Sequence, residues 1–265
     1  MSGDGVNYEV VLRNHLHLGQ DVVGEGREKV VTVAGERGDK VWVQYSRDGE
    51  NKDALVAGPE FFKAQFYLHK ILHELLPDNF PDYLLTGQGG LLVERIPADE
   101  DAKRANDIMQ LVRQRRLETG SGYCESDEHE WLTQKHNAIY YSDEYQTLAR
   151  VLEYIGVAEV GDRDRDAYEL AVPVNTYIVD GHPVIIETMD PLVKTKSERG
   201  TEGRDLLLNI DRLGEVVDEG VVVGKVTEEA ARKIRKYAQR YKVNANSAIE
   251  SWMVARNSLE TLTEL

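Results

Sequence analysis

The stretch from residue 172 to residue 191, VPVNTYIVDGHPVIIETMDP, constrains the fold more than any other part of the chain. Two runs rich in β-branched residues flank an Asp-Gly pair at 180–181, which is the strongest short-range signal of a β-hairpin. The two strands of a hairpin run antiparallel, so Asn175, Glu187 and Asp190 return to the same end. We therefore expect a hairpin within 172–188. Its open end is either a site where these side chains share a ligand or a solvated strand end.

Length and composition indicate a globular chain with a real core, since 41% of its 265 residues are hydrophobic. No run approaches the roughly 18 apolar residues of a membrane span, and the first residues lack the pattern of a signal peptide. We therefore expect a cytoplasmic protein with no membrane segment. The net charge of −15 argues against general nucleic-acid binding, which needs a basic face. A basic cluster at 113–116 is typical of a solvated helix end, and the lone Cys124 cannot form an intramolecular disulfide.

The first 96 residues predict a lobe made of an antiparallel sheet and one helix. β-like runs at 8–12, 30–33 and 41–45 are separated by glycines. Pro59 then stands where a helix begins, and apolar residues recur at helical spacing until Pro77 ends it. Two short strands follow, at 83–86 and 91–96.

A charged break at 97–101 predicts a hinge to a second, mainly helical lobe that covers residues 97–265. This lobe is expected to hold a helix from near Asp99 to about Leu117, a polar loop over 118–130, a helix over 145–155, the hairpin, and two final helices over 227–241 and 246–262. Thr227 is a plausible N-cap for the first of these two. The segment 192–205 is rich in charge and predicts an exposed, mobile stretch. The fold class is therefore α+β in two lobes.

Residues 22–31, VVGEGREKVV, predict a strand that turns over glycines into a second strand. The pattern G-x-G-x-x-G-x-V is met at Gly24, Gly26 and Val31, while Lys29 stands at the third glycine. Backbone N–H groups in such a turn can approach phosphate oxygens without obstruction by side chains. A plain hairpin turn is the alternative interpretation.

The order of these parts over roughly residues 19–191 resembles the protein-kinase-like superfamily, including its small-molecule phosphotransferases. The resemblance implies a glycine-rich loop over the phosphates of ATP, a strand lysine paired with a helix glutamate, and a hinge that holds adenine. On this basis Gly24 and Gly26 lie over the phosphates. Gln44 stands where the family has its lysine, and Glu94 lies near the end of the strand before the hinge, so both are candidates for nucleotide binding.

The resemblance also implies a magnesium site at the open end of the hairpin. In the family an asparagine and an aspartate about a dozen residues later hold the metal. Asn175 and Glu187 are twelve residues apart here, and a glutamate suits magnesium because this ion prefers oxygen ligands. Asp190 is a second candidate for the carboxylate. The implied cofactors are therefore ATP and magnesium.

Two residues of the family pattern are absent. Leu170 stands five residues before Asn175, where the family has its catalytic aspartate, and a leucine cannot accept a proton. Asp166 and Glu169 are the candidate bases, and Asp162 and Asp164 are further carboxylates in a longer loop. Gln44 brings no positive charge. Other side chains that could supply the charges of the lysine–glutamate pair are Lys40, Arg47, Lys63 and Glu60.

Histidines offer a weaker alternative. His69 and His73 lie four residues apart on the helix that begins at Pro59 and could bind a metal together, but the sequence HKILH lacks the glutamate of an HExxH motif. Three hypotheses follow. The chain is a divergent ATP- and magnesium-dependent phosphotransferase, or an inactive pseudokinase-like protein that binds a protein partner, or an unrelated intracellular α+β interaction protein.

Overall fold

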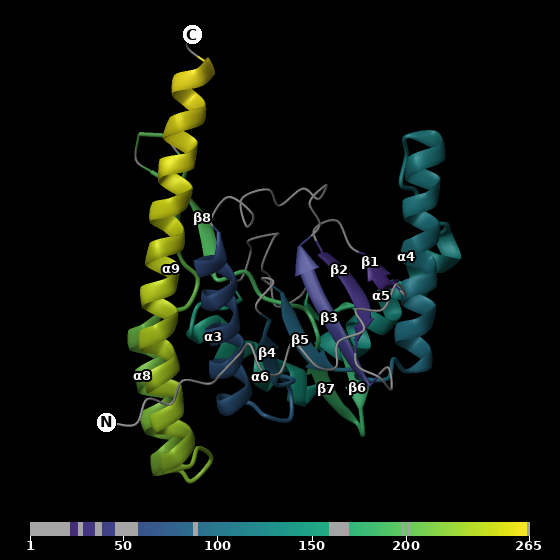
Figure 1. Cartoon of the computed structure of the whole chain (residues 1–265). Coiled ribbons are helices and arrows are strands. Elements are labelled where there is room, and N and C mark those ends of the chain that lie inside the picture. The colour runs from purple at the N-terminus through teal and green to yellow at the C-terminus, as the bar shows by residue number, and fades with distance from the viewer. Residues whose placement is uncertain are drawn as a thin grey trace.

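The chain is described from a computed structural model (Figure 1). The structure describes residues 22–25, 29–34, 39–45, 58–86, 90–158, 170–197, 199–200 and 202–263. The strand expected at 8–12 lies outside these residues, as do the candidate site residues Gly26, Asp166 and Glu169.

A five-stranded antiparallel sheet lies at the centre of the molecule, as expected (Figure 1). Its strands are β1 (Val22–Glu25), β2 (Lys29–Ala34), β3 (Lys40–Tyr45), β4 (Tyr83–Leu85) and β5 (Leu91–Glu94). They lie in the order β1-β2-β3-β5-β4. The last two strands, β4 and β5, therefore extend the sheet beyond β3, and β5 lies next to β3. Valines dominate β2 and β3, and their branched side chains pack well on a pleated surface.

Helix α3 (Pro59–Leu75) lies between this sheet and the long helix α9 (Glu228–Thr263), as Figure 1 shows. The helix expected to begin at Pro59 is confirmed, with the proline in the first turn, where its missing N–H is not needed. Phe66 packs on the strands against Tyr83 and Val93. Leu68 and Leu72, fully buried, belong to the main core, which joins α3 to the C-terminal helices.

Four further helices complete the described helical part: α4 (Glu100–Thr119), α5 (Ser126–Tyr140), α6 (Asp143–Tyr154) and α8 (Ile210–Val222). Asp99 caps α4, since its side chain accepts a hydrogen bond from the Ala102 N–H at 2.6 Å. The polar loop expected over 118–130 is shorter than predicted, because Glu125 and Glu128 form a capping box that starts α5. Helix α8 was not predicted; Leu213 and Val217 lie one turn apart on its buried side.

The hairpin expected around the Asp-Gly pair is confirmed as β6 (Thr176–Val179) and β7 (His182–Ile185). Asp180 and Gly181 have φ angles of 51° and 87°, the left-handed values that a two-residue turn between twisted strands requires. The expectation of a mobile segment over 192–205 was wrong. Most of that stretch forms a second hairpin, from β8 (Leu192–Lys196) and β9 (Glu202–Leu206). Cross-strand pairing stabilises it despite its many charges.

The two final helices expected at 227–241 and 246–262 form one continuous helix, α9. Thr227 caps it, as expected, by accepting a hydrogen bond from the Ala230 N–H at 3.1 Å. The asparagines near the expected break do not interrupt the helix; Asn244 donates back to the carbonyl of Arg240 at 2.7 Å. In the C-terminal half of α9 the buried Trp252 packs beneath Arg204 of β9.

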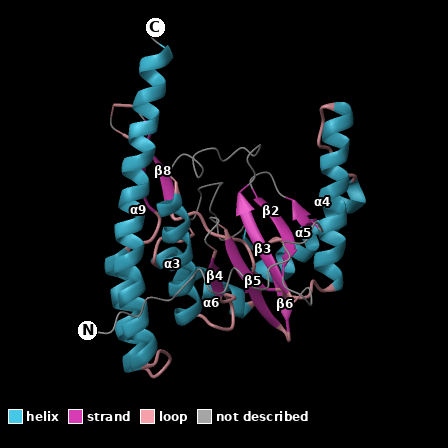
Figure 2. Cartoon of the chain, viewed as in Figure 1, coloured by secondary structure: helices cyan, strands magenta, loops and turns pink. Residues whose placement is uncertain are grey.

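The fold is therefore a mixed one, with helices on both flanks of small antiparallel sheets, as Figure 2 shows. The main core joins α3 to α6, α8 and α9, while the sheet has a smaller core of its own beneath α3. The boundary expected between residues 96 and 97 stays a prediction. No helix in the described ranges combines the length and the apolar composition that crossing a bilayer requires.

Candidate functional site

The backbones at Asn175 and Glu187 come close together at the open end of the β6–β7 hairpin. Thr176 pairs with Ile185 in the last register position of the two strands. Just beyond it, the Ile186 N–H donates to the Asn175 carbonyl oxygen at 2.8 Å. The two candidate metal ligands are therefore adjacent to residues joined by a backbone hydrogen bond, and both are half-buried. The convergence expected from the hairpin is present at the level of the backbone.

Two side chains of α3 hold the chain just after Glu187. The amide Nε2 of Gln65 donates to the Met189 carbonyl oxygen at 3.1 Å, and the Met189 N–H donates to Nε2 of His69 at 3.1 Å. Both polar groups of one backbone residue are thus bound by neighbouring turns of one helix. Gln65 and His69 are 2% and 1% exposed. Sequence patterns did not indicate this contact, although two polar residues on an otherwise apolar helix face were a usable signal.

Tyr83 of β4 holds the same segment from the sheet. Its hydroxyl donates to the Ile186 carbonyl oxygen at 3.2 Å, and its ring lies 4.4 Å from the ring of His69. Burial raises the pKa of Tyr83 far above its usual value, and the negative charge of Glu187 raises it further. Tyr83 is therefore a neutral donor, and Glu187 is close enough to influence it electrostatically.

The opposite end of β7 is bound by the turn that follows α3. Asn79 donates from Nδ2 to the Pro183 carbonyl oxygen at 2.9 Å, and its own carbonyl oxygen accepts from the Ile185 N–H at 2.8 Å. The hairpin is thus attached at several points to the helix and strands that precede residue 96. These contacts place its open end beside α3 and β4.

The face of the sheet on which α3 packs also carries half-buried valines. Val41 packs against the small sheet core, and its cross-strand partner on β2 is Val33. Val43 pairs with Val31 in the same way and lies opposite Leu91 of β5. Directly opposed residues share one face of a sheet. Four valines therefore form an apolar surface, partly open to solvent, on the face from which Tyr83 reaches the hairpin.

The candidates for nucleotide binding are dispersed along the strands. Gly24 lies in β1 opposite Val31, and Gln44 lies in β3 opposite Val30, with its side chain outside the described part. Glu94 is exposed at the end of β5. Its partner there is Lys40, and alternation of side chains places it on the face opposite to Tyr83. Glu94 is therefore not grouped with Asn175 and Glu187.

The position expected for a catalytic base is apolar in structure as well as in sequence. Leu170 is 7% exposed and belongs to the main core. Its carbonyl oxygen accepts a hydrogen bond from the hydroxyl of Thr176 at 2.6 Å. The candidate bases Asp166 and Glu169 precede it and lie outside the described residues, so their role stays a prediction.

The two helix histidines point to different backbone partners. His69 is bound to Met189, and Nδ1 of His73 lies 2.8 Å from the Phe80 carbonyl oxygen. In the described part of the chain, three or more His, Cys, Asp or Glu side chains do not group closely enough to hold a metal ion. Magnesium, however, is commonly bound by one or two carboxylates together with phosphate oxygens and water. The oxygens of Asn175, Glu187 and Asp190 are ligands of that kind.

The charged groups around the α4–α5 loop pair with one another. Arg115 contacts Glu128 at 2.7 Å and Glu125 at 3.1 Å, in agreement with a structural role for this basic cluster. Burial, followed by the charge of Glu128, raises the pKa of the Cys124 thiol. A raised pKa makes a thiol a poor nucleophile near neutral pH, so Cys124 is not a candidate catalytic residue.

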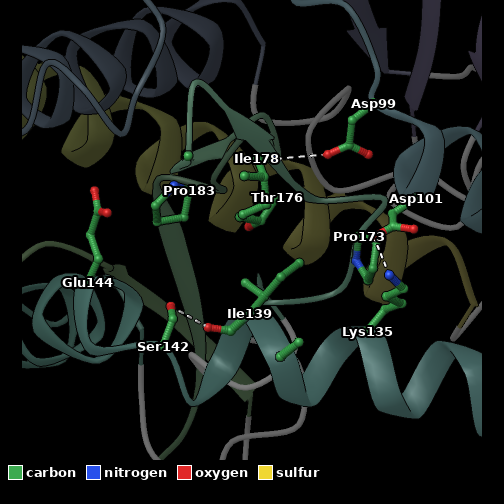
Figure 3. Close-up of a pocket in the computed structure, with 12 residues that line it drawn as sticks. Asp99, Asp101, Lys135, Ile139, Ser142, Glu144, Pro173, Thr176, Ile178 and Pro183 are labelled. Atoms are coloured by element: carbon green, nitrogen blue, oxygen red, sulfur yellow. Dashed lines mark hydrogen bonds and ion pairs between the residues drawn. The ribbon is translucent and has the colours of Figure 1, made fainter.

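A pocket of about 200 Å³ lies on the other side of the hairpin, between β6–β7 and the helices α5 and α6 (Figure 3). Its polar side chains are engaged with protein partners. Asp99 accepts from the Ile178 N–H at 3.3 Å, and Lys135 pairs with Asp101 at 2.6 Å. The residues that line it are Asp99, Asp101, Lys135, Ala138, Ile139, Ser142, Glu144, Pro173, Thr176, Ile178, Gly181 and Pro183. This set contains none of the metal candidates, so the pocket and the candidate site are separate features.

At the rim of this pocket, His182 pairs with Glu144 through Nδ1 at 2.9 Å. The hydrogen bond to Glu144, followed by its charge, raises the pKa of His182 above the usual 6.5. A group whose pKa is raised on folding stabilises the fold below its unfolded pKa, and this contribution is lost as the pH rises through the folded pKa. We therefore expect Glu144→Gln to lower the melting temperature below about pH 6 and to have little effect well above the raised pKa. An NMR titration in which His182 keeps the same pKa in this variant would contradict the pairing.

Comparisons with known proteins identify no relative of this chain. No family model, no curated protein and no solved structure matches it. Its function must therefore be inferred from its residues and their contacts.

Proposed function

We propose that the chain is a divergent kinase-like protein that binds ATP with magnesium between the five-stranded sheet and the β6–β7 hairpin. The observation that carries the proposal is the backbone hydrogen bond from Ile186 to Asn175, which brings the two expected metal-binding positions together. Asn175 and Glu187 would hold the ion, with Asp190 as the further carboxylate. A bound magnesium ion would neutralise charge on the phosphates.

Two features of the sheet support this proposal. Three strands, a helix and two strands precede the helical part and the hairpin, which is the order that the resemblance implies. The apolar surface formed by Val31, Val33, Val41 and Val43 is suited to the flat face of a nucleobase, because ligand pockets are lined mainly by apolar side chains. This surface and the metal candidates lie on the same side of the sheet as Tyr83, so one nucleotide could contact both.

A second candidate function is nucleotide binding without phosphate transfer, as in a pseudokinase that binds a protein partner. The buried Leu170 favours it, because the position expected for the catalytic base cannot accept a proton. Gln44, at the position of the family lysine, adds no positive charge to stabilise phosphates. Both candidate functions require the same nucleotide site and differ only in turnover.

A thermal-shift titration tests the nucleotide site. A ligand that binds only the folded state raises its stability by mass action, by about 2.7 kcal/mol at a hundredfold excess over Kd. We expect ATP with magnesium to raise the melting temperature of the parent more than ATP alone. In Asn175→Ala and Glu187→Ala this extra increase should be lost, because each removes an oxygen ligand.

Glu144→Ala is the matched control. It removes a carboxylate of α6 that pairs with His182, at the turn end of the same hairpin. It should keep the full magnesium-dependent increase. The absence of any shift of the parent at roughly millimolar ATP would contradict both nucleotide functions and favour an interaction protein without a nucleotide. Where binding is present, the release of ADP from magnesium–ATP then separates the two candidates, and none is expected from a pseudokinase.

A further inference from the structure

We propose that Gln65 and His69 are positioning residues that fix the backbone of the candidate metal-binding segment, residues 187–190. Their hydrogen bonds with Met189 set the magnesium affinity of the site. The inference rests on the proposed function, because it concerns the same ion. It gives Gln65 a role that the sequence pattern did not indicate and gives His69 a role other than metal ligand, and it places part of the site on α3.

The contacts fix the backbone on both sides of Glu187. On one side, Ile186 is bound through its N–H to Asn175 and through its carbonyl oxygen to Tyr83. On the other side, Met189 is bound through its carbonyl oxygen to Gln65 and through its N–H to His69. The two residues between these anchors, Glu187 and Thr188, have little freedom to move. The direction in which the Glu187 carboxylate leaves the backbone is therefore set by side chains that are not themselves metal ligands.

The chemistry of the two residues suits this role. An acceptor is needed for the Met189 N–H, so Nε2 of His69 must carry no proton and the ring must be the neutral tautomer protonated on Nδ1. Gln65 supplies the donor. Both stand on the same helix face as the apolar Leu68 and Leu72. Buried polar groups are costly on such a face unless they are hydrogen-bonded, and the contacts with Met189 satisfy the Gln65 amide nitrogen and Nε2 of His69.

The helix that carries this pair is itself firmly anchored. Besides the apolar core that joins α3 to α9, the rings of Tyr67 and Tyr237 stack at 6.1 Å, and Arg240 donates to the Tyr67 hydroxyl at 3.2 Å. Lys233 pairs with Glu74 at 3.1 Å. Groups that orient a metal ligand from a rigid element hold it more closely than groups on loops. The α3–α9 pair is such an element.

The test compares two substitutions of His69. His69→Leu removes the acceptor, whereas His69→Gln places an amide oxygen close to the position of Nε2. At fixed concentration of a non-hydrolysable ATP analogue, we expect His69→Leu to need ten to a hundred times more magnesium to reach half of the magnesium-dependent rise in melting temperature. His69→Gln should remain near the parent. Gln65→Met, which keeps the side-chain volume and removes the donor, should behave like His69→Leu.

A second measurement needs no ligand. The Met189 amide, buried and bound to His69 in the parent, should exchange its hydrogen at least tenfold faster in His69→Leu than in His69→Gln. Trp252→Ala is the control for loss of stability alone, because it removes a buried side chain of α9 that lies beneath Arg204 of β9 and leaves Met189 bound. It should lower the melting temperature without changing the magnesium midpoint.

The outcomes separate this inference from the proposed function. Loss of the magnesium effect in Glu187→Ala together with an unchanged midpoint in His69→Leu would leave the site in place and overturn the role of His69. An equal change of midpoint in Trp252→Ala would show that stability alone is responsible, which also overturns it. A parent that shows no response to nucleotide and magnesium overturns the proposed function, and this inference with it.

Discussion

Replacement of Tyr241 by phenylalanine is expected to lower the free energy of unfolding by about 2 kcal/mol. The hydroxyl of this fully buried residue donates to the Pro191 carbonyl oxygen and accepts from the Leu208 N–H at 3.1 Å. The variant leaves the buried Leu208 N–H without this partner, which costs about 1–3 kcal/mol. The Pro191 carbonyl oxygen keeps a hydrogen bond from the Leu207 N–H at 3.0 Å. Chemical denaturation measures the change.

Tyr67→Phe is the matched control for this prediction. The Tyr67 hydroxyl also has a partner, Arg240, but the contact is exposed, so water replaces it and the loss should stay below about 0.5 kcal/mol. Equal losses in the two variants would show that the bonds of Tyr241 between α9 and the segments at Pro191 and Leu208 contribute nothing specific to stability.

Replacement of Trp252 by alanine is expected to cost about 4 kcal/mol, because it removes a large side chain that is 7% exposed. The guanidinium groups of Arg204 and Arg256 lie over its ring, each 5.5 Å from the ring centroid, and Arg256 also donates to the Glu202 carbonyl oxygen. The tryptophan thus joins β9 to α9. We expect amide exchange in β8 and β9 to accelerate more than exchange in β6 and β7.

Trp131→Ala provides the comparison for Trp252. Trp131 also has a cation over its ring, with Arg104 at 4.3 Å, but it is only half-buried. Its loss should cost about 1 kcal/mol and leave the exchange of β8 and β9 unchanged. The prediction for Trp252 is wrong if these two strands keep parental exchange rates in Trp252→Ala.

The elements that could be predicted from the sequence are those whose turns or ends are determined by residues close to them in the chain. The turn at 180–181 follows from the left-handed conformation that Gly, and less often Asp, adopts readily. The start of α3 at Pro59 and the cap of α4 at Asp99 likewise depend on residues within one turn. The approach of the backbones at Asn175 and Glu187 follows from the hairpin alone, whereas the role of these residues as metal ligands stays a prediction.

Other elements depend on contacts that a local pattern does not contain. The strands β8 and β9 carry few apolar residues, and their pairing is supported by packing of Arg204 and Arg256 on Trp252. The continuity of α9 was missed because VNANS has low helix propensity, yet Ala245 and Ala248 are buried there, and tertiary packing overrides propensity.

The hydrogen bonds that join Gln65 and His69 to Met189 could not be derived from the helical periodicity of the sequence. Gln65 and His69 are separated from Met189 by 124 and 120 residues. Helical spacing places both on the buried side of α3 but does not name what they meet there. Such a pairing becomes visible only when the hairpin and the helix have been brought together by the rest of the fold.

The packing of α3 on α9 also bears on how the chain folds while it is being synthesised. Glu74 and Lys233, which join the two helices, are 159 residues apart in the chain. At the usual rates of translation the ribosome needs on the order of ten seconds to make that length. During this interval Leu68 and Leu72 lack the part of the main core that α9 supplies, although the α6 residues that share this core are made earlier. Closing so long a loop also slows folding. The core around α3 is therefore completed only after α9 emerges.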